Sequence, residues 1–455
     1  MSIPNLDSIA SAIQSIDLPP LLAAMADHYG DRRFIAAEFR PARPTVGAIV
    51  RADGGLSQSV QAAARDLVVT TLAAGEPSAK AESIDPQEIL SFLTGERDSP
   101  FMRRIAREIT GRSSNFQDEK LSGLTVAVIG GGVSGICASV KLMEQGADCT
   151  VFDRNDSLGG TWFANAYPGC RLDTSTFVYS FSFAQRTDWK YTYSPRSEVL
   201  RYVQEVADAH QVPERTIFNA EVVRLVWKEA EAKWSVTWKD SSSAEQSRLF
   251  DIVVSAVGQL NQPKIPAFAG IENFQGEIVH SATWPALTDV KDRRVAVVGS
   301  GASGFQIVPE IADQVESLTL FQRNAPWLLP EPRYENPTDG LQKTLLDNIP
   351  PYHRWYRFWQ FWAAAEGRLP LSIVDPDWKN KGSVSELNEN FRAELVEHLE
   401  KQFGDDPELL KKMMPDYPPG SKRLVRDSGR WAAALKRPNV NVESSPIDKL
   451  TESGI

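Results

Sequence analysis

Residues 124–135 read LTVAVIGGGVSG, and this stretch decides the fold. Its first six residues form a β-branched, uncharged run typical of a buried parallel strand. The glycines Gly130, Gly132 and Gly135 follow in the pattern GxGxxG, and a helical pattern then continues to Leu142. A second strand is expected over residues 149–152 (CTVF). The stretch therefore predicts a βαβ unit with a glycine-rich turn between its first strand and its helix.

The same pattern returns about 170 residues later, as an internal repeat. Residues 294–298 (RVAVV) predict a strand, a helix is expected to about Ile311, and a second strand over residues 318–321. The turn of this copy contains Gly299, Gly301, Ser303 and Gly304. A repeat is more informative than either copy alone. We therefore expect an α/β protein with two dinucleotide-binding domains of the Rossmann type.

The residue that ends each unit indicates which nucleotide the unit binds. In a GxGxxG turn the pyrophosphate approaches the second glycine and the N-terminus of the helix. Asp153 lies 18 residues after Gly135, where a carboxylate accepts a bond from a ribose hydroxyl, as FAD or NAD requires. Arg323 takes this place in the second unit and can pair with a 2′-phosphate, which predicts NADP. A solvated strand end stays open as the alternative for Arg323.

Pattern and punctuation divide the chain into six parts. They are a helical N-terminal extension (1–118), the first part of an FAD-binding domain (119–273), a linker (274–285), the first part of an NADP-binding domain (286–334), a helical insertion (335–418) and the return to the NADP-binding domain (419–455). We interpret the extension as a packing or oligomerisation segment, with a homodimer as one outcome. The aromatic stretch 352–362 predicts a helix packed in the core or at an interface.

Composition excludes several classes of function. The 455 residues carry a net charge of −10 with a pI near 5.3, which argues against a nucleic-acid partner. We find neither a secretory signal pattern nor an apolar run of about 18 residues, and we expect a cytoplasmic protein without a membrane span. The three cysteines form neither CxxC nor a zinc pattern, and no hydrolase motif is present, so we expect no metal site. The chemistry is therefore assigned to cofactors.

Residues 274–285 (FQGEIVHSATWP) lie between the two glycine turns. They match the pattern FxGxxxHxxxWP through Phe274, Gly276, His280, Trp284 and Pro285. This segment resembles the fingerprint of the flavin-dependent Baeyer–Villiger monooxygenases, and the resemblance extends over about residues 121–455. The N-terminal extension is similar to that of the 4-hydroxyacetophenone monooxygenase group, whose members oxidise aryl ketones to esters.

The resemblance implies an FAD- and NADPH-dependent enzyme that inserts one oxygen atom from O₂ next to a ketone carbonyl, through a flavin peroxide. It implies Arg423 as the catalytic arginine, oriented by Asp173. On the same ground the FAD contacts are Gly130, Gly132, Gly135, Asp153, Gly160, Thr161, Trp162, Asp173, Tyr179 and Val222. The NADPH contacts are Gly299, Gly301, Ser303, Gly304, Arg323, Lys422 and Arg423.

The chain departs from the family at its C-terminal end. Residues 441–450 are expected to start a meander equivalent to the one at 219–238, and the returning FAD segment does not follow. We therefore expect a truncated product. Three alternatives stay open: an N- or S-oxygenase of the flavin-containing type, an NADPH oxidase that releases peroxide, and an inactive nucleotide-binding remnant without stable flavin.

Overall fold

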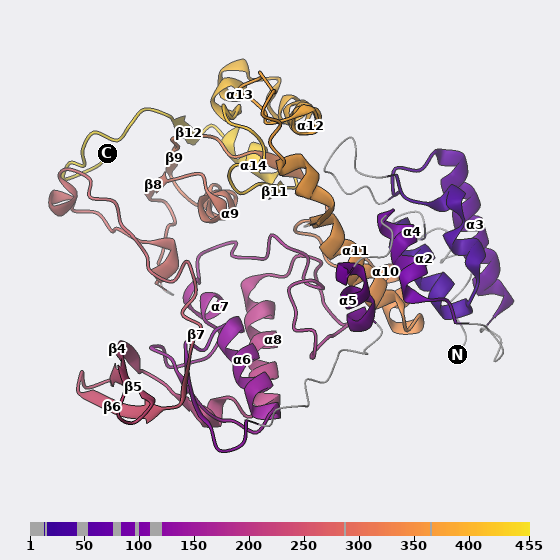
Figure 1. Ribbon diagram of the computed structural model, residues 1–455. Coiled ribbons are helices and arrows are strands. Elements are labelled where there is room, and N and C mark those ends of the chain that lie inside the picture. The colour runs from indigo at the N-terminus through magenta and orange to yellow at the C-terminus, as the bar shows by residue number, and fades with distance from the viewer. Residues whose placement is uncertain are drawn as a thin grey trace.

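The first module is built on a four-stranded parallel sheet with the order β3-β2-β1-β7 (Figure 1). Its elements are β1 (Thr125–Ile129), α6 (Val133–Glu144), β2 (Asp148–Phe152), α7 (Thr161–Ala164), α8 (Arg196–Ala209), η4 (Pro213–Arg215), β3 (Thr216–Ile217) and β7 (Ile252–Ser255). Strand β1 lies between β2 and β7 and is buried from Val126 onward, as its uncharged sequence predicts. The predicted βαβ unit is confirmed. The computed structural model describes residues 13, 16–42, 53–75, 83–95, 100–109, 121–285, 288–364 and 366–455.

A separate antiparallel sheet of three strands follows β3. Its strands are β4 (Glu221–Lys228), β5 (Lys233–Lys239) and β6 (Glu245–Phe250). The sequence predicts the first two, whereas β6 was missed because its residues EQSRLF are polar and almost wholly exposed. In Figure 1 this sheet lies at one end of the first module, away from its helices.

The second module has a three-stranded parallel sheet with the order β12-β9-β8. Its elements are β8 (Arg294–Val298), α9 (Ala302–Ile311), β9 (Ser317–Phe321), α14 (Arg430–Leu435) and β12 (Val440–Glu443). The second βαβ unit is thus confirmed. Beside it, β10 (Leu328–Pro330) and β11 (Val425–Asp427) form a short parallel pair that the sequence did not reveal.

The expectation for residues 441–450 was wrong. Strand β12 runs parallel to β9, with Val440 opposite Leu318, so it is the third parallel strand and does not begin an antiparallel meander. Its counterpart in the first module is β3, which also pairs in parallel with the second strand of its unit. Because β3 has only two residues, it gives a weak strand pattern in the sequence. Residues 441–450 were therefore matched to the strands that follow β3 and not to β3 itself.

Between the modules, the short 3₁₀ turn η5 (Ile271–Asn273) directly precedes the linker, and η6 (Ser281–Thr283) lies within it; the described residues of the linker contain no strand. The linker contacts the C-terminal end of the chain, because the Gln275 backbone N–H donates to the Glu452 carbonyl at 2.9 Å.

The helical insertion is present as predicted. It comprises α10 (Gly340–Asn348), α11 (Tyr352–Ala364), η7 (Glu366–Ser372), α12 (Glu386–Phe403) and α13 (Pro407–Met413). The aromatic side chains of α11 are mostly buried, with Tyr352 and Trp355 wholly so, and they share a core with the N-terminal helices and the first module. The expectation that this stripe packs in a core is confirmed.

The N-terminal extension is helical where the structure describes it. Its elements are α2 (Leu18–Tyr29), η2 (Arg32–Ile35), η3 (Ala37–Phe39), α3 (Gln58–Ala74), α4 (Pro86–Thr94) and α5 (Pro100–Ile109), and the rest of residues 1–118 lies outside the described ranges. The Ser57 hydroxyl accepts a bond from the Val60 N–H and so caps the start of α3. Helix α11 lies between these helices and the pair α12 and α13 (Figure 1). Within the described part of the chain, no helix is both long and apolar enough to cross a membrane.

Candidate functional site

The first glycine turn has a backbone that only glycine adopts readily. Gly130 has φ of +106°, and its N–H donates to the Phe152 carbonyl at 2.8 Å. A Cβ on Gly135 would lie 1.8 Å from the Gly130 carbonyl oxygen, so the third glycine lets the helix approach the strand. Helix α6 begins directly after Gly132, and its free N–H groups face the turn.

Asp153 lies buried at the end of β2, and its carboxylate accepts three hydrogen bonds from the surrounding chain. One carboxylate oxygen accepts the Gly131 N–H at 2.6 Å, and the other accepts two bonds from Asn155, at 2.8 and 2.9 Å. A carboxylate has about four acceptor sites, so one remains for a ribose hydroxyl. The geometry fits the nucleotide end of FAD.

A second loop crosses the first turn. Gly160 has φ of +54°, and a Cβ on it would lie 2.7 Å from the Gly132 Cα. From this loop the Trp162 indole N–H donates to the Tyr179 hydroxyl at 3.0 Å, with the two rings nearly perpendicular. Burial raises the pKa of Tyr179, which keeps its hydroxyl protonated as the indole's acceptor. Gly160, Thr161, Trp162 and Tyr179 are therefore brought together beside the turn, as an extended flat ligand would need.

Val222 does not join this group. It lies in β4 opposite Trp238, at the point where the register of β4 and β5 shifts, and packs beneath that sheet. The core it joins contains Ile129 and Phe152, which precede Gly130 and Asp153 in the chain, and the assignment of Val222 to FAD stays a prediction.

The second turn repeats the backbone of the first. Gly299 has φ of +106° and donates to the Phe321 carbonyl at 2.8 Å, and a Cβ on Gly304 would lie 2.0 Å from the Gly299 carbonyl oxygen. A Cβ on Gly301 would meet no atom within 4 Å, and Ser303 is half-buried in the first turn of α9. The N-terminus of α9 is therefore open to a phosphate group.

Two basic side chains lie at the end of β9. Arg323 is exposed and, among the described residues, has no ion-pair partner. The Lys422 ammonium donates to the Asn324 side-chain oxygen at 3.0 Å and lies 4.2 Å from the centre of the Tyr417 ring. Lys422 thus reaches the residue next to Arg323.

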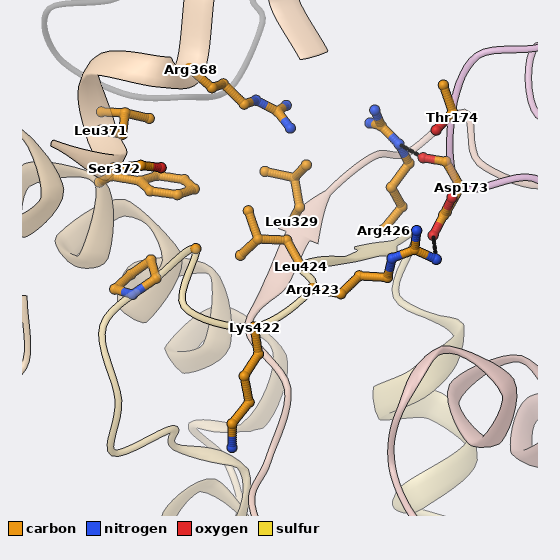
Figure 2. Close-up of a pocket in the computed structure, with 13 residues that line it drawn as sticks. Asp173, Thr174, Leu329, Arg368, Leu371, Ser372, Lys422, Arg423, Leu424 and Arg426 are labelled. Carbon is orange, nitrogen blue, oxygen red and sulfur yellow. Dashed lines mark hydrogen bonds and ion pairs between the residues drawn. The ribbon is translucent and has the colours of Figure 1, made fainter. Parts of the chain in front are cut away.

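Arg423 and Asp173 form an ion pair at 3.0 Å, although 250 residues separate them in the chain. Figure 2 shows both at the wall of one pocket, joined by a dashed line. The Arg423 side chain is 65% exposed, so most of its guanidinium faces the pocket and solvent. The Arg426 Nε donates to the Asp173 backbone carbonyl at 2.6 Å, which holds the carboxylate's own backbone.

Arg426 was missed by sequence reasoning. Its guanidinium also pairs with Glu331 at 3.3 Å, and the Tyr193 hydroxyl donates to the same Glu331 oxygen at 2.7 Å. The one available signal was its position three residues after Arg423, in a sequence segment otherwise assigned to the NADP-binding domain.

The pocket has a volume of about 290 Å³. Four parts of the chain line it: the first module at Asp173 and Thr174, β10 at Leu329, the helical insertion from Arg368 to Phe391, and the segment from Pro419 to Arg426. Its apolar wall is formed by Leu329, Leu371, Phe391 and Leu424. It therefore lies where the two nucleotide modules and the insertion meet.

The linker motif does not line this pocket. The His280 ring nitrogen Nδ1 accepts the Ala282 N–H at 3.1 Å and begins η6, while Gly276 packs against the Phe274 ring. Trp284 packs against the core of the second module, and Pro285 is exposed beside it. These residues thus lie between the two modules in the chain.

Three comparisons with known proteins agree with this arrangement. The family model of the flavin-binding monooxygenase-like proteins matches residues 123–344. A Baeyer-Villiger monooxygenase from Streptomyces coelicolor is 34% identical, over 72% of this chain and 60% of the relative. A 2-oxo-Delta(3)-4,5,5-trimethylcyclopentenylacetyl-CoA monooxygenase from Pseudomonas putida is 30% identical, over 74% of this chain and 67% of the relative.

Among solved structures, OTEMO in complex with FAD and NADP is similar, with a TM-score of 0.61 and 26% identity over 73% of this chain and 68% of that one. The chain spans 54–66% of the length of four curated relatives that it matches.

Proposed function

The chain belongs to the flavin-dependent Baeyer–Villiger monooxygenase family, and from that premise we propose that it takes part in the NADPH-dependent oxidation of a ketone to an ester. The ion pair between Arg423 and Asp173, at the pocket that both nucleotide modules and the insertion line, is the observation that carries this proposal. FAD, when bound, supplies the redox and oxygen chemistry, and NADPH supplies the hydride. We infer a ketone substrate from the family. We infer an aryl ketone from the subgroup that the N-terminal extension resembles.

Arg423 would stabilise the negative charge that develops on the ketone oxygen when its carbonyl carbon is attacked. A guanidinium stays charged throughout the physiological pH range, so it contributes without losing a proton. Asp173 fixes its direction through the 3.0 Å contact, and Arg426 fixes Asp173 in turn. Preorganised donors of this kind typically lower a barrier by about 3 to 4 kcal/mol.

Arg323 and Lys422 would select NADPH over NADH. Both lie at the end of β9, whereas the corresponding position of the first module carries the buried carboxylate of Asp153. A carboxylate repels a 2′-phosphate and a guanidinium pairs with it, so the two turns would take different nucleotides. The homodimer and the cytoplasmic location expected from the sequence remain predictions.

The test is an absorbance spectrum of the purified chain with added FAD, before and after NADPH under air. We expect a bound-flavin spectrum that bleaches and then recovers, and an aryl ester from acetophenone in the product extract. The Arg423→Ala variant should still bind and reduce FAD but form ester about 100- to 1,000-fold more slowly. Ester formation at the wild-type rate in that variant would remove Arg423 from the mechanism.

The oxygenase alternatives are separated by substrate. A sulfide and a tertiary amine are offered in parallel with acetophenone, and Arg423→Ala is measured with each. We expect only the ketone reaction to depend strongly on Arg423, because only that reaction develops an oxyanion on the substrate.

A further inference from the structure

Asp17 directly precedes helix α2 of the N-terminal extension but does not cap it. A side chain in this position usually accepts a bond from the backbone N–H of the second or third helical residue. Here those residues are Pro19 and Pro20, which have no N–H, and the Asp17 carboxylate makes no capping bond. Asp17 is only 2% exposed, so its carboxylate needs partners elsewhere in the chain.

Both oxygens of this carboxylate are bound by residues that lie 316 and 343 positions away in the sequence. Oδ1 lies 3.3 Å from Arg333 Nη1, and Oδ2 accepts the Gln360 side-chain N–H at 2.9 Å. Burial raises the pKa of the Asp17 carboxyl, and the positive charge of Arg333 opposes that rise. The negative charge of Asp17 in turn raises the pKa of the Arg333 guanidinium. This pair joins the N-terminal extension to the segment after β10.

From Arg333 the contacts continue to the carboxylate that pairs with Arg423. Arg333 Nε lies 3.5 Å from one oxygen of Glu331, and Arg426 contacts the other oxygen at 3.3 Å. The Arg426 Nε then donates to the Asp173 backbone carbonyl at 2.6 Å. These residues are here called the Asp17 network: Asp17, Arg333, Glu331, Arg426 and Asp173.

The middle of the Asp17 network is shielded from solvent. The Glu331 and Arg426 side chains are each 11% exposed, and the Tyr193 hydroxyl donates to Glu331 at 2.7 Å. Burial raises the pKa of Tyr193, so this hydroxyl stays protonated. Asp17, Glu331 and Arg333 line a small cavity of about 30 Å³ and not the pocket itself, whereas Arg426 lines both. The Asp17 network therefore reaches the pocket at Arg426.

Glu331 is shared between two guanidinium groups, and this sharing makes its position depend on Asp17. While Asp17 binds Arg333, that guanidinium is divided between two carboxylates. Without Asp17, the charge of Arg333 would attract Glu331 more strongly and loosen its contact with Arg426. In Figure 2, Arg426 and Arg423 reach Asp173 by separate dashed lines, so a shift of Arg426 would move the acceptor of Arg423.

We propose that Asp17 is a positioning residue for the ion pair between Arg423 and Asp173, and that it acts through the other members of the Asp17 network. The N-terminal extension is then part of the candidate active site and not a packing segment alone. This inference rests on the proposed function for the role of Arg423. The position of the Arg423 guanidinium, however, can be measured without turnover.

The test measures how fast phenylglyoxal modifies Arg423 in the purified 455-residue chain, by peptide mass spectrometry, relative to the exposed Arg323 in the same sample. A carboxylate partner protects a guanidinium from this reagent, because it favours the charged form. Asp17→Asn keeps the size of the side chain but removes its charge. We expect Arg423 to react about two- to fivefold faster in this variant, as the loss of a largely exposed ion pair would give.

A second substitution should reverse this effect. In the double variant Asp17→Asn/Arg333→Gln, no guanidinium at position 333 draws Glu331 away from Arg426. The Arg423 rate should therefore return to about the wild-type value. If Asp17 were only structural, removing its partner as well would bring no rescue.

Asp27→Asn is the matched control. Asp27 also joins α2 to α11, because it accepts the Trp355 indole N–H at 2.8 Å, but it lies outside the Asp17 network. This variant should leave the Arg423 rate unchanged. In the enzyme with FAD and NADPH, Asp17→Asn should slow ester formation about 10- to 100-fold and leave flavin reduction and sulfide oxidation at their wild-type rates.

An unchanged Arg423 rate in Asp17→Asn overturns the proposal. An equal rise in Asp27→Asn also overturns it, since the cause would then be looser helix packing. A double variant as reactive as Asp17→Asn, or an Asp17→Asn chain that circular dichroism shows to be unfolded, would make Asp17 a structural residue and has the same consequence. Because the labelling needs no turnover, the expected labelling pattern without ester formation by the wild-type chain would refute the proposed function alone.

Discussion

The two glycine turns have the same backbone: Gly130 in the first module and Gly299 in the second both have φ of +106°. Each N–H donates at 2.8 Å to a carbonyl at the end of the second strand of its unit, that of Phe152 or of Phe321. What surrounds the two turns differs. A Cβ on Gly130 would meet the Ala256 carbonyl oxygen at 2.6 Å, because the chain after β7 passes directly over the turn. A Cβ on Gly299 would meet no atom within 4 Å.

The strands below the turns differ in the same way. Strand β1 is buried between two neighbours, whereas β8 is the edge strand of its sheet and alternates between exposed and half-buried residues. The backbone conformation of each turn is therefore set by its own strand, glycines and helix. It does not depend on the chain segment after β7, which passes over the first turn only. A glycine in these turns can thus serve one of two purposes: it allows close packing within the fold, or it leaves space for a ligand.

The largest expected effect comes from the third glycine of each turn. In Gly135→Ala the new methyl would overlap the Gly130 carbonyl, and Gly130 cannot move because Ala256 lies against it. We expect a loss of more than about 4 kcal/mol, enough to unfold the first module. In Gly304→Ala the overlap is similar, but Gly299 has free space around it, so we expect a loss of about 1–3 kcal/mol.

Urea unfolding followed by circular dichroism, together with FAD uptake, measures both variants. Equal destabilisation by the two substitutions would show that the covering segment does not hold the first turn in place. Gly340→Ala is the matched control, since a Cβ at this helical glycine meets no atom within 4 Å.

The second expected effect uses the cysteines, because all three lie in the first module. Burial raises the pKa of Cys149, in the middle of that sheet, to about 11. Since the thiolate is the reactive form, iodoacetamide at pH 8 should alkylate Cys149 about 100-fold more slowly in the folded chain than in urea. The unfolded rate should level off above the ordinary thiol pKa near 9, whereas the folded rate should stay well below it at that pH.

Peptide mass spectrometry measures the alkylation rate of Cys149 separately from that of the other two cysteines. Gly304→Ala should keep the slow alkylation and Gly135→Ala should lose it, because only the second substitution opens the first module. Fast alkylation of Cys149 in the folded wild-type chain would contradict the burial of β2.

Local patterns predicted much of this fold, and the predicted parts share a physical cause. The two βαβ units follow from runs of apolar residues and from the residues that begin or end them. The contact between Asp173 and Arg423 followed from the family resemblance, and the structure places the two side chains 3.0 Å apart.

The parts that were missed depend on distant or weak signals. Strand β6 is polar because it lies at an exposed edge, and β10 and β11 are three residues long and pair across about 100 residues. The ion pair between Asp17 and Arg333 joins residues that are 316 positions apart, and a contact over such a distance leaves no periodicity in the chain. Such contacts are properties of the tertiary structure alone.

The smallest effect on stability is expected at Gly301, the second glycine of the second turn. This substitution tests whether the glycine is there for the fold or for the cofactor. Gly301 has φ of −70°, which any residue adopts, and a Cβ on it would meet no atom within 4 Å. Gly301→Ala should therefore leave the free energy of unfolding within about 0.5 kcal/mol of wild type. If a pyrophosphate approaches this backbone, the methyl should weaken NADP⁺ binding about tenfold, as measured by calorimetry. The corresponding Gly132→Ala places its methyl 3.4 Å from the Gly160 Cα, so it should reduce stability as well as FAD binding. An unchanged NADP⁺ affinity in Gly301→Ala would mean that the open turn is not the cofactor's site, since the fold itself gives no reason for a glycine there.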